Sequence, residues 1–276
     1  MSISTISQLF DAEGYTVIQD FLSDDDVGDL TRKIIPLIEA NAGTRRLLSL
    51  PWCAEFAERI RTDQRLQPLL PNASQAVQCT LFTKSPANNW LVALHQDLSI
   101  PVADRVDSPT YTGWSQKEGD LFVQPPHALL KQLVAIRLHL DDCDERSGAL
   151  RVVPGSHRLG RLSSNDALGE REGRGERPVP VARGGAMAMS PLLLHASSKT
   201  TSALPRRVVH FLFGPAALPD GLRWPQRMER PRYGCTSSRR ARAGNGRRGA
   251  PGLEQGVAGS LKKLSGSGGV LWSNQN

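Results

Sequence analysis

Residues 132–140 read QLVAIRLHL, and we interpret this apolar run as a β-strand. Apolar and β-branched side chains fill it, and it contains neither glycine nor proline, as is typical of a strand inside a sheet. Alternate side chains of a strand point to the same face, so Arg137 and His139 point together, either inward or toward solvent. The sequence leaves both orientations open. Pointing inward, the pair would approach a substrate or cosubstrate.

Further strands are predicted on both sides of this run. Each is a short apolar or β-branched stretch, and turn sequences such as Pro154-Gly155-Ser156 and Gly184-Gly185 separate them. The predicted strands cover residues 15–18, 75–84, 90–95, 149–153, 185–189, 192–195 and 206–213.

Helical patterns are confined to the first part of the chain. Ser23 precedes three aspartates and can cap a helix whose apolar residues continue to Ile38, although Pro36 should kink or shorten it. A second helix is predicted from Pro51 through Leu69. Helices that precede a series of strands indicate an α+β fold with a mainly β core, not alternating βαβ units.

Two long segments lack a periodic pattern and are predicted as loops. Residues 98–126 are rich in turn residues, and long insertions of this kind are usually lids or binding loops. Their charged residues Arg105, Lys117 and Glu118 are candidates for substrate selection, with ordinary solvated loop charges as the alternative. The charged, glycine-rich residues 161–183 form a second predicted loop, which we expect to be mobile.

The positive charge of the chain is concentrated in residues 231–276. The formal net charge is +7, and this segment contains eight basic side chains and one acidic side chain. The rest of the chain is therefore neutral overall, which argues against nucleic-acid binding by its body. Because the segment is rich in Gly, Arg and Ser, we predict that it is a disordered tail and that residues 1–230 form the folded domain. An RNA-binding arm is the alternative role for the tail.

Composition argues against several classes of protein. No run approaches 18 consecutive apolar residues, so we expect no membrane-spanning helix. The N-terminal residues lack a basic region followed by an apolar stretch, so we expect no secretory signal. The four cysteines lie far apart without CxxC spacing, which argues against a zinc ribbon or a disulfide framework. Together these features predict a soluble cytoplasmic protein.

A His-x-Asp motif lies at the end of one predicted strand. His95 and Asp97 are two residues apart in the sequence ALHQD, so on an extended strand their side chains project to the same face. An imidazole and a carboxylate are two ligands of the 2-His-1-carboxylate arrangement that holds non-haem iron. A solvated strand end would explain the same two residues, so the motif alone does not decide.

Two later residues extend the motif into a candidate site. His195 ends the apolar run PLLL, where a histidine is either a hydrogen-bonded core residue or a ligand. Arg206 begins the predicted strand RRVVHFLF, and an arginine that enters an apolar strand needs an anionic partner. Each residue alone has a structural explanation, but their combination and order favour one metal site next to one anion site.

Several ordered motifs give the chain a family resemblance. They are GYTVI at 14–18, LHQD at 94–97, LHLDDCDERSGALRVVPGSHRLG at 138–160, LLHASS at 193–198 and PRR at 205–207. With these motifs, over roughly residues 8–225, the chain resembles the phytanoyl-CoA dioxygenase (PhyH-like) family of Fe(II)/2-oxoglutarate-dependent oxygenases. The resemblance implies a double-stranded β-helix, that is, a cupin-like jelly roll with flanking N-terminal helices. It also implies that His95, Asp97 and His195 are the iron ligands.

The resemblance further implies a site for 2-oxoglutarate. Arg206 would bind its distal carboxylate with Ser197 beside it, and Lys84 and Trp114 would lie near the cosubstrate. Dioxygen would be the second cosubstrate. The implied reaction is hydroxylation of a small molecule with release of succinate and CO2, because related halogenases have a small residue in place of the carboxylate of Asp97.

The substrate and the oligomeric state stay open at this point. The segment after the His-x-Asp motif does not reproduce the pattern of ectoine hydroxylases, so ectoine is not the expected substrate. The alternative function is a non-catalytic jelly-roll binding protein that has kept the fold without turnover. The presence of the three metal-ligand candidates and of Arg206 argues against it, since a binding protein need not retain them.

Overall fold

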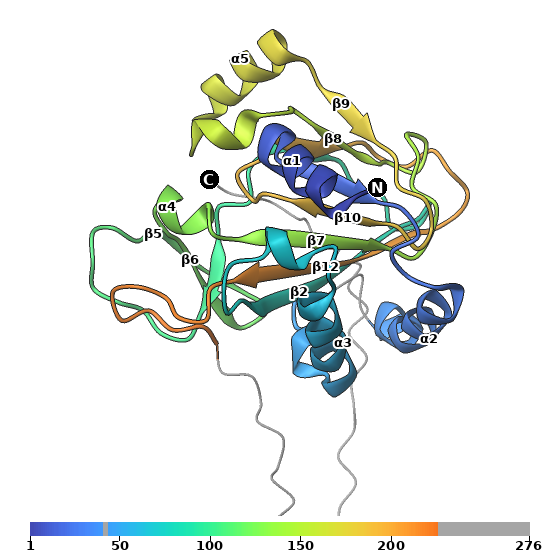
Figure 1. Ribbon diagram of the computed structural model, residues 1–276, viewed down its shortest axis with the longest axis horizontal. Coiled ribbons are helices and arrows are strands. Elements are labelled where there is room, and N and C mark those ends of the chain that lie inside the picture. Colours follow the sequence, from blue (N-terminus) through green and yellow to red (C-terminus); the bar gives the residue numbers. More distant parts are fainter. Residues whose placement is uncertain (41–43, 226–276) are drawn as a thin grey trace, which may run out of the picture. The chain divides into compact units, whose positions relative to one another are not determined.

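The computed structural model describes residues 1–40 and 44–225, and in these ranges the strands form two larger sheets and a smaller third sheet (Figure 1). The predicted disordered tail, residues 231–276, lies outside the described residues. The tail's disorder and the domain boundary at residue 230 therefore stay predictions.

The main sheet contains the long apolar runs of the sequence. Its strand order is β1-β10-β7-β12-β2, and every neighbouring pair is antiparallel. Each of the five strands confirms a predicted one, with ends that differ by two residues or fewer. They are β1 (Tyr15–Ile18), β10 (Ala186–Met189), β7 (Val134–His139), β12 (Arg206–Gly214) and β2 (Gln75–Lys84).

The second sheet faces the main sheet across an apolar core. Leu150 and Val152 of this sheet belong to the same buried cluster as Met187 and Leu212 of the main sheet. Two antiparallel sheets that enclose one core confirm the predicted jelly roll. The strand order is β3-β11-β8-β9, with β3 (Val92–His95), β11 (His195–Ser197), β8 (Leu150–Val152) and β9 (Arg177–Val179).

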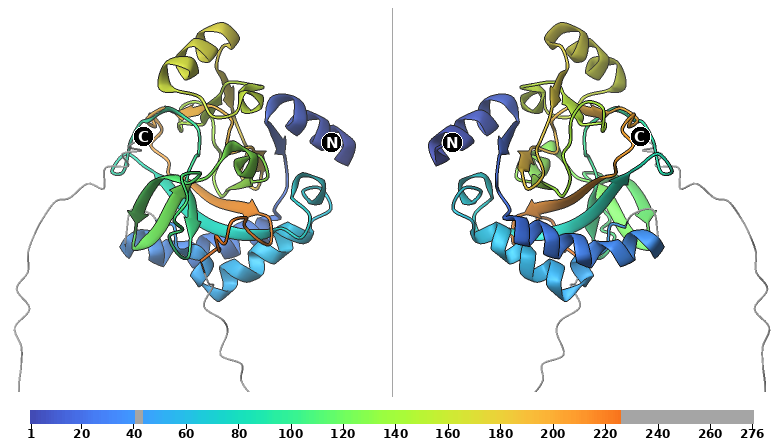
Figure 2. Two further views of the ribbon diagram at one scale, coloured as in Figure 1. Left: turned by 90° about the vertical axis from the view of Figure 1, so that its left-hand side faces the viewer. Right: turned by 90° about the vertical axis from the view of Figure 1, so that its right-hand side faces the viewer.

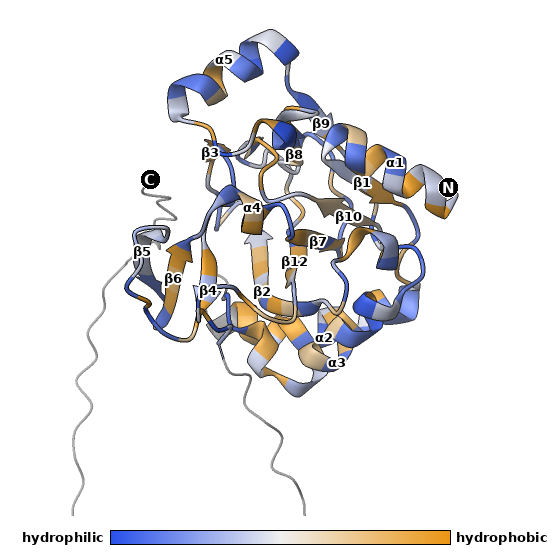
Figure 3. Ribbon diagram, turned by 60° about the vertical axis from the view of Figure 1, so that its left-hand side comes forward, coloured by the Kyte–Doolittle hydropathy of each residue, from blue (hydrophilic) through white to orange (hydrophobic). Residues whose placement is uncertain are grey.

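Helices pack against the outer face of the main sheet. Ile136 and Leu138 of β7 form one buried cluster with Phe56 of the third helix. Figure 2 shows α2 and α3 against this sheet, and Figure 3 shows how hydrophobic and hydrophilic residues alternate along them. Since neighbouring strand residues point to opposite faces, Arg137 and His139 point into the jelly roll. The helices are α1 (Ile3–Glu13), α2 (Asp24–Ala40) and α3 (Pro51–Thr62). No helix in the described ranges is long and apolar enough to cross a membrane.

The helices differ from the predicted ones at their C-terminal ends. Helix α2 continues through Pro36, which is exposed and lies near the end of the helix, where one missing N–H bond is tolerated. The prediction that the second helix reaches Leu69 was wrong. It ends at Thr62, because the Oδ1 atom of Asp63 accepts a 2.9 Å hydrogen bond from the backbone N–H of Arg65 and stabilises a turn instead.

Residues 98–126 are not a loop, which corrects the sequence prediction. They form a three-stranded antiparallel sheet of order β4-β6-β5. Glu118 and Gly119 join β5 to β6 in a two-residue turn with φ of 53° and 86°, the geometry of a tight hairpin. The elements are β4 (Ile100–Val102), β5 (Thr112–Lys117) and β6 (Asp120–Gln124), followed by α4 (His127–Leu130).

Residues 161–183 are also more ordered than predicted. They contain β9 and a helix, α5 (Ser164–Arg174). The Ser163 Oγ atom accepts a 3.2 Å hydrogen bond from the backbone N–H of Asp166 and caps the helix. An ion pair between Arg174 and Glu170 (2.5 Å) supports its last turn. The charged residues that suggested a loop therefore stabilise an exposed helix.

The strand predicted at 192–195 begins only at its last residue. Ser190 starts a turn in which its carbonyl accepts a 3.0 Å hydrogen bond from the backbone N–H of Leu193. Pro191 within this turn has no N–H to donate to a neighbouring strand, so strand pairing begins further along the chain. His195 is therefore the first residue of β11, not the last residue of a strand.

Candidate active site

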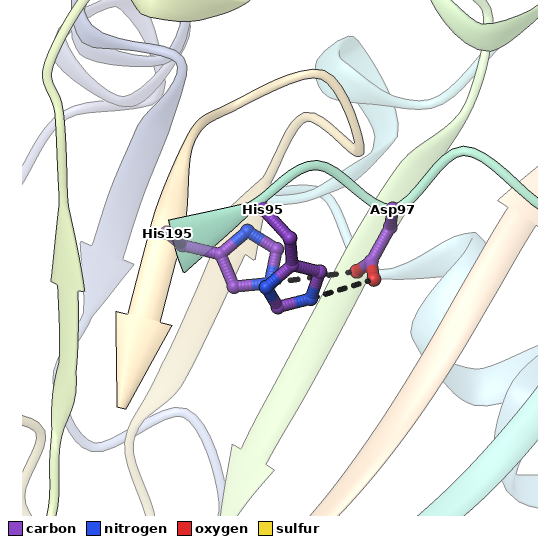
Figure 4. Close-up of side chains that lie close together, drawn as sticks. All are labelled: His95, Asp97 and His195. Carbon is purple, nitrogen blue, oxygen red and sulfur yellow. Dashed lines mark ion pairs between the residues drawn. The ribbon is translucent and has the colours of Figure 1, made fainter. Parts of the chain in front are cut away.

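Two histidines meet across the second sheet. His95 ends β3 and His195 begins β11, and they are direct partners in the antiparallel ladder. Side chains that are directly opposite each other lie on the same face, so the two rings come together, with their centroids 4.2 Å apart (Figure 4). Residues one hundred positions apart in sequence thus supply two imidazoles to one point in the jelly roll.

The segment after β3 places Asp97 beside both rings. The backbone N–H of Asp97 donates a 2.8 Å hydrogen bond to the carbonyl of Pro191. The buried side chain of Gln96 donates to the carbonyls of Gly160 and Leu192, both at 2.7 Å, and accepts from the N–H of Leu162 at 2.9 Å. These bonds fix the direction in which the Asp97 carboxylate projects.

The three side chains have the geometry of an open metal site. The Nε2 atom of His95 lies 3.5 Å from Oδ1 of Asp97, and Nε2 of His195 lies 3.7 Å from Oδ2 of Asp97 (Figure 4). One ligand atom from each residue lies within 4.8 Å of the other two. This is the 2-His-1-carboxylate donor set, which leaves positions free on a six-coordinate ion such as Fe(II).

Hydrogen bonds set the tautomers that metal binding requires. The Nδ1 atom of His95 donates to the carbonyl of Ala93, and Nδ1 of His195 donates to the carbonyl of Leu193, each at 2.9 Å. A carbonyl oxygen can only accept, so in each neutral ring the proton is on Nδ1 and Nε2 carries the lone pair. Backbone bonds of this kind orient metal-binding histidines in proteins.

The charges of the triad also suit a divalent cation. Burial alone would raise the pKa of the Asp97 carboxyl, but the attraction of His195 and His95 lowers it by more. The pKa of Asp97 therefore lies well below its ordinary value. Burial and the neighbouring His95 lower the pKa of His195 to about 4. At neutral pH the site therefore offers an ionised carboxylate and at least one neutral imidazole.

A buried basic site lies at one end of the main sheet. Arg206 begins β12 and is paired in register with Lys84, the last residue of β2. Lys84 is 0% exposed, and its Nζ atom donates to the Ser197 Oγ atom at 2.7 Å and to the Ser198 carbonyl at 2.6 Å. Arg206 and Ser197 both donate to the carbonyl of Gly148, at 2.7 and 2.8 Å. Three of the four residues predicted for the cosubstrate thus lie together.

This basic site needs an anion. Burial, followed by repulsion from Arg206 and Arg137, lowers the pKa of Lys84 to about 7. Arg206 is 3% exposed, and its Nε atom has no hydrogen-bond partner. Within the described part of the chain, neither Lys84 nor Arg206 forms an ion pair with a carboxylate. A buried arginine without a partner carries a desolvation cost that a carboxylate ligand would offset. The site therefore fits the distal carboxylate of 2-oxoglutarate.

A comparison with protein families is consistent with this chemistry. Residues 10–208 match the model of the family described as phytanoyl-CoA dioxygenase (PhyH). This chain belongs to the PhyH family. The match confirms the family resemblance and makes the protein an oxidoreductase of the Fe(II)/2-oxoglutarate-dependent class. No curated protein matches the sequence.

Solved structures share the fold of this PhyH protein. AviO1 from Streptomyces viridochromogenes is 19% identical with a TM-score of 0.55, and the alignment covers 79% of this chain and 97% of that chain. EctD from S. alaskensis is 16% identical with a TM-score of 0.58, covering 78% and 77%. HygX from Streptomyces hygroscopicus, solved with nickel and 2-oxoglutarate bound, is 20% identical with a TM-score of 0.52, covering 77% and 87%. At these identities the likeness establishes the fold.

Trp114 lies outside the two larger sheets, and its contact with the cosubstrate stays a prediction. It lies on β5 in the third sheet and packs at the edge of the apolar cluster between the sheets. The guanidinium of Arg105 lies 5.2 Å from its ring centroid. The segment around Trp114 that was predicted as a loop is a hairpin.

The charged residues proposed for substrate selection have local partners. Glu118 accepts hydrogen bonds from the side chain and the backbone of Arg45, at 3.0 and 2.9 Å. Lys117 lies 5.0 Å from the ring centroid of Phe122. Burial and the charge of Arg45 lower the pKa of Lys117. The charge of Asp97 partly offsets this lowering.

Three further residues line the interior of the jelly roll, and the sequence left the orientation of two of them, Arg137 and His139, open. Arg137 and His139 of β7 and His210 of β12 are all buried on the inner face. Period-2 alternation grouped Arg137 with His139, but only the register and the position of the helices show which face is inside. Together with Lys84 and Arg206 they form what we call the basic cluster.

Proposed function

We propose that this PhyH enzyme hydroxylates a small-molecule substrate, consuming O2 and 2-oxoglutarate and releasing succinate and CO2. The observation that carries the proposal is the position of an open 2-His-1-carboxylate site beside a buried basic site without a carboxylate partner. Neither feature alone would suffice, because acidic clusters and core histidines occur without metals. Their combination matches a metal ion and a dicarboxylate that bind next to each other.

The proposed roles follow from the contacts of each residue. His95, Asp97 and His195 hold the iron through Nε2, a carboxylate oxygen and Nε2. Arg206 and Lys84 hold the distal carboxylate of 2-oxoglutarate. When bound, iron and 2-oxoglutarate supply the oxidising power that inserts one oxygen atom of O2 into a substrate C–H bond.

The protein contributes orientation and the exclusion of water. Gln96 fixes the segment that carries Asp97, and the backbone carbonyls of Ala93 and Leu193 fix the two rings. The residues of the basic site are buried, which strengthens the attraction for a carboxylate. By contrast, the Asp97 side chain is 41% exposed, so the substrate reaches the iron from this open side.

Retention of the carboxylate at position 97 supports hydroxylation over halogenation. A halide needs a coordination position that a small residue would leave free, whereas Asp97 occupies it. Ectoine does not follow from the likeness to EctD, since 16% identity establishes the fold alone. The proposed substrate is therefore a small molecule whose identity must be found by screening.

The test is anaerobic addition of Fe(II) and 2-oxoglutarate, followed by visible absorption. The wild type should develop a metal-to-ligand charge-transfer band, and Asp97→Ala and Arg206→Ala should both weaken it. Arg207→Ala is the matched control, because Arg207 is adjacent but pairs with Asp141, 2.8 Å from its Nε atom, on the outer face. No band from folded, iron-supplemented wild type would overturn the proposal and favour a non-catalytic binding protein. A band justifies a substrate screen by succinate release.

A further inference from the structure

The basic cluster has two ends on the inner face of the main sheet. At one end Arg206 of β12 is paired with Lys84 of β2. At the other end His210 of β12 is paired with Arg137 of β7. The two pairs are four residues apart on one strand, which is about 13 Å at about 3.3 Å per residue. These backbone positions leave room for two carboxylates of one molecule, one held at each end by a long side chain.

Arg137 is buried without an acidic partner. It is 5% exposed, and its Nε atom has no hydrogen-bond partner. Its Nη1 atom donates to Nδ1 of His210 at 3.0 Å, and its guanidinium lies 5.5 Å from the ring centroid of Phe82. No ion pair in the described ranges includes Arg137. These contacts orient the guanidinium but leave its charge uncompensated.

An uncompensated buried arginine indicates an anionic ligand. The guanidinium stays protonated at any physiological pH, so it cannot lower its desolvation cost by losing a proton. His210, its hydrogen-bond partner, is neutral, because burial and then Arg137 lower the pKa of His210 to about 3. The planar fork of Arg137 is suited to a carboxylate, and the free Nε–H is one of the donors that a carboxylate would use.

The surroundings show which carboxylate fits this end. The charge of Asp97 acts on both Arg137 and His210, and that of His195 acts on His210. Arg206, by contrast, is paired with Lys84, whose Nζ atom donates to Ser197, two residues beyond His195 on β11. The Arg137 end of the cluster therefore lies toward the metal triad, and the Arg206 end lies away from it.

His139 lies between the two ends and is also without a partner. It is paired in register with Val208, midway between Arg206 and His210. Both of its ring nitrogens are buried without a hydrogen bond. Burial and the two flanking arginines hold the pKa of His139 well below its ordinary value, so the ring is neutral. A polar ligand that runs from one end of the cluster to the other would give His139 a partner.

We propose that Arg137, oriented by His210 and Phe82, binds the carboxylate of 2-oxoglutarate that lies next to the metal, while Arg206 binds the distal carboxylate. This inference rests on the proposed function. It makes Arg137 a second cosubstrate-binding residue, in addition to the arginine expected from the family resemblance.

Binding of two 2-oxo acids separates the two ends. Pyruvate carries the carboxylate and keto group that would lie at the metal but lacks the distal carboxylate. Each acid is titrated anaerobically into the Fe(II)-loaded wild type, Arg137→Met and Arg206→Met, and the charge-transfer band reports binding. Loss of a charge-assisted hydrogen bond predicts about 10- to 100-fold weaker 2-oxoglutarate binding in both variants. Pyruvate binding should weaken in Arg137→Met only.

Two controls keep the result interpretable. Arg207→Met removes an arginine from the same strand but from the outer face, and it should leave both affinities unchanged. Arg137→Lys keeps the buried charge, so it should fold even if Arg137→Met does not. It should bind 2-oxoglutarate more weakly than wild type, because a lysine cannot reproduce the planar fork. Arg207→Met should also bind Fe(II) without 2-oxo acid as tightly as wild type, and saturation of each Arg137 and Arg206 variant with Fe(II) shows that its metal site is intact.

The failures of the two proposals are distinguishable. If wild type binds 2-oxoglutarate and the folded Arg137 variants bind it equally well, Arg137 does not contact the cosubstrate and the inference is overturned. Equal weakening of pyruvate by Arg206→Met would also overturn it, since the two ends would not be separate. If wild type binds Fe(II) but no 2-oxoglutarate, the proposed function itself falls, and the inference with it.

Discussion

The metal triad and the basic cluster lie in the same jelly roll, but their charges are balanced in different ways. In the triad, Asp97 lies 3.5 and 3.7 Å from the Nε2 atoms of His95 and His195, so either imidazole can balance the carboxylate by taking up a proton. In the basic cluster, Lys84, Arg137 and Arg206 have no carboxylate partner among the described residues. The triad can therefore balance its own charge, whereas the described residues offer the cluster no carboxylate.

This difference has a consequence for stability. Uncompensated buried cations destabilise the ligand-free protein, and a dicarboxylate that binds only the folded state would stabilise it. On the proposed function, the basic cluster binds the cosubstrate at the expense of folding stability. The buried charge of the triad destabilises the protein less, because this one negative charge lies close to two imidazoles. Replacing a buried cation of the basic cluster should therefore raise the stability of the ligand-free protein and weaken ligand binding.

The largest effect is expected from removal of the carboxylate of the triad. Asp97→Ala should weaken Fe(II) binding by about 100-fold or more, since even the loss of residues that only orient metal ligands costs about 10- to 100-fold. Anaerobic Fe(II) titration measures this. Asp104→Ala is a matched control, because Asp104 pairs with Arg223 on the surface. Near-wild-type Fe(II) affinity in Asp97→Ala would show that the triad does not bind Fe(II).

Replacing one buried cation should separate stability from binding. Lys84→Met exchanges the ammonium for an apolar group of similar length, so it should raise the free energy of unfolding of the ligand-free protein by about 1–3 kcal/mol. The same variant should bind 2-oxoglutarate about 10-fold more weakly. Denaturant unfolding measures the stability, with exposed Lys131→Met as the control. A less stable Lys84→Met protein would show that the ammonium is already satisfied by Ser197 and Ser198.

The pH dependence of stability provides a third test of the uncompensated charge. The pKa of Lys84 is about 7 in the fold against an ordinary 10.5. Between these values the unfolded chain binds more protons, so the free energy of unfolding should rise with pH from about 7 to 10, by up to about 1.4 kcal/mol per pH unit. Arg206, Arg137, Arg151 and the Cys143 thiol are the groups that act on Lys84. Lys84→Met should remove this rise, and an identical slope in the variant would contradict the assignment.

The smallest effect is expected at the residue that supports the triad without binding the metal. Gln96→Met leaves the carbonyls of Gly160 and Leu192 without a donor, so it should destabilise the protein by about 1–3 kcal/mol. Fe(II) affinity should fall by about 10-fold, because Asp97 loses its fixed direction. Thermal unfolding and Fe(II) titration measure the two effects, with exposed Gln132→Met as the control. Unchanged Fe(II) affinity would show that the backbone alone orients Asp97.

The sequence predicts the main sheet and the triad well for a physical reason. The strands β7 and β12 contain long apolar runs, and burial on both faces leaves little choice of structure for them. The triad could be predicted because its motif combines a short spacing with a family resemblance. Arg206 and Lys84 meet because register pairs the first residue of one strand with the last residue of another.

Other features depend on information that local sequence does not carry. The orientation of Arg137 is set by strand register, and a shift by one residue would move it to the helix-covered face. Strand β5 (Thr112–Lys117) was missed because its residues TGWSQK are mostly polar and half-exposed. The hairpin that carries Trp114 was missed for the same reason. Helix α5 was missed because its many charged residues and its glycines favoured a loop over a helix capped by Ser163.

The central claim is that the triad and the basic cluster form one binding site, and thermodynamic coupling tests it most directly. 2-Oxoglutarate is titrated calorimetrically, without oxygen, into wild type and Asp97→Ala, each with and without Fe(II). If one ligand bridges both regions, Fe(II) should strengthen 2-oxoglutarate binding by about 10-fold or more in wild type, and this coupling should vanish in Asp97→Ala. Equal 2-oxoglutarate affinity in wild type with and without Fe(II) would show two independent sites and contradict the account.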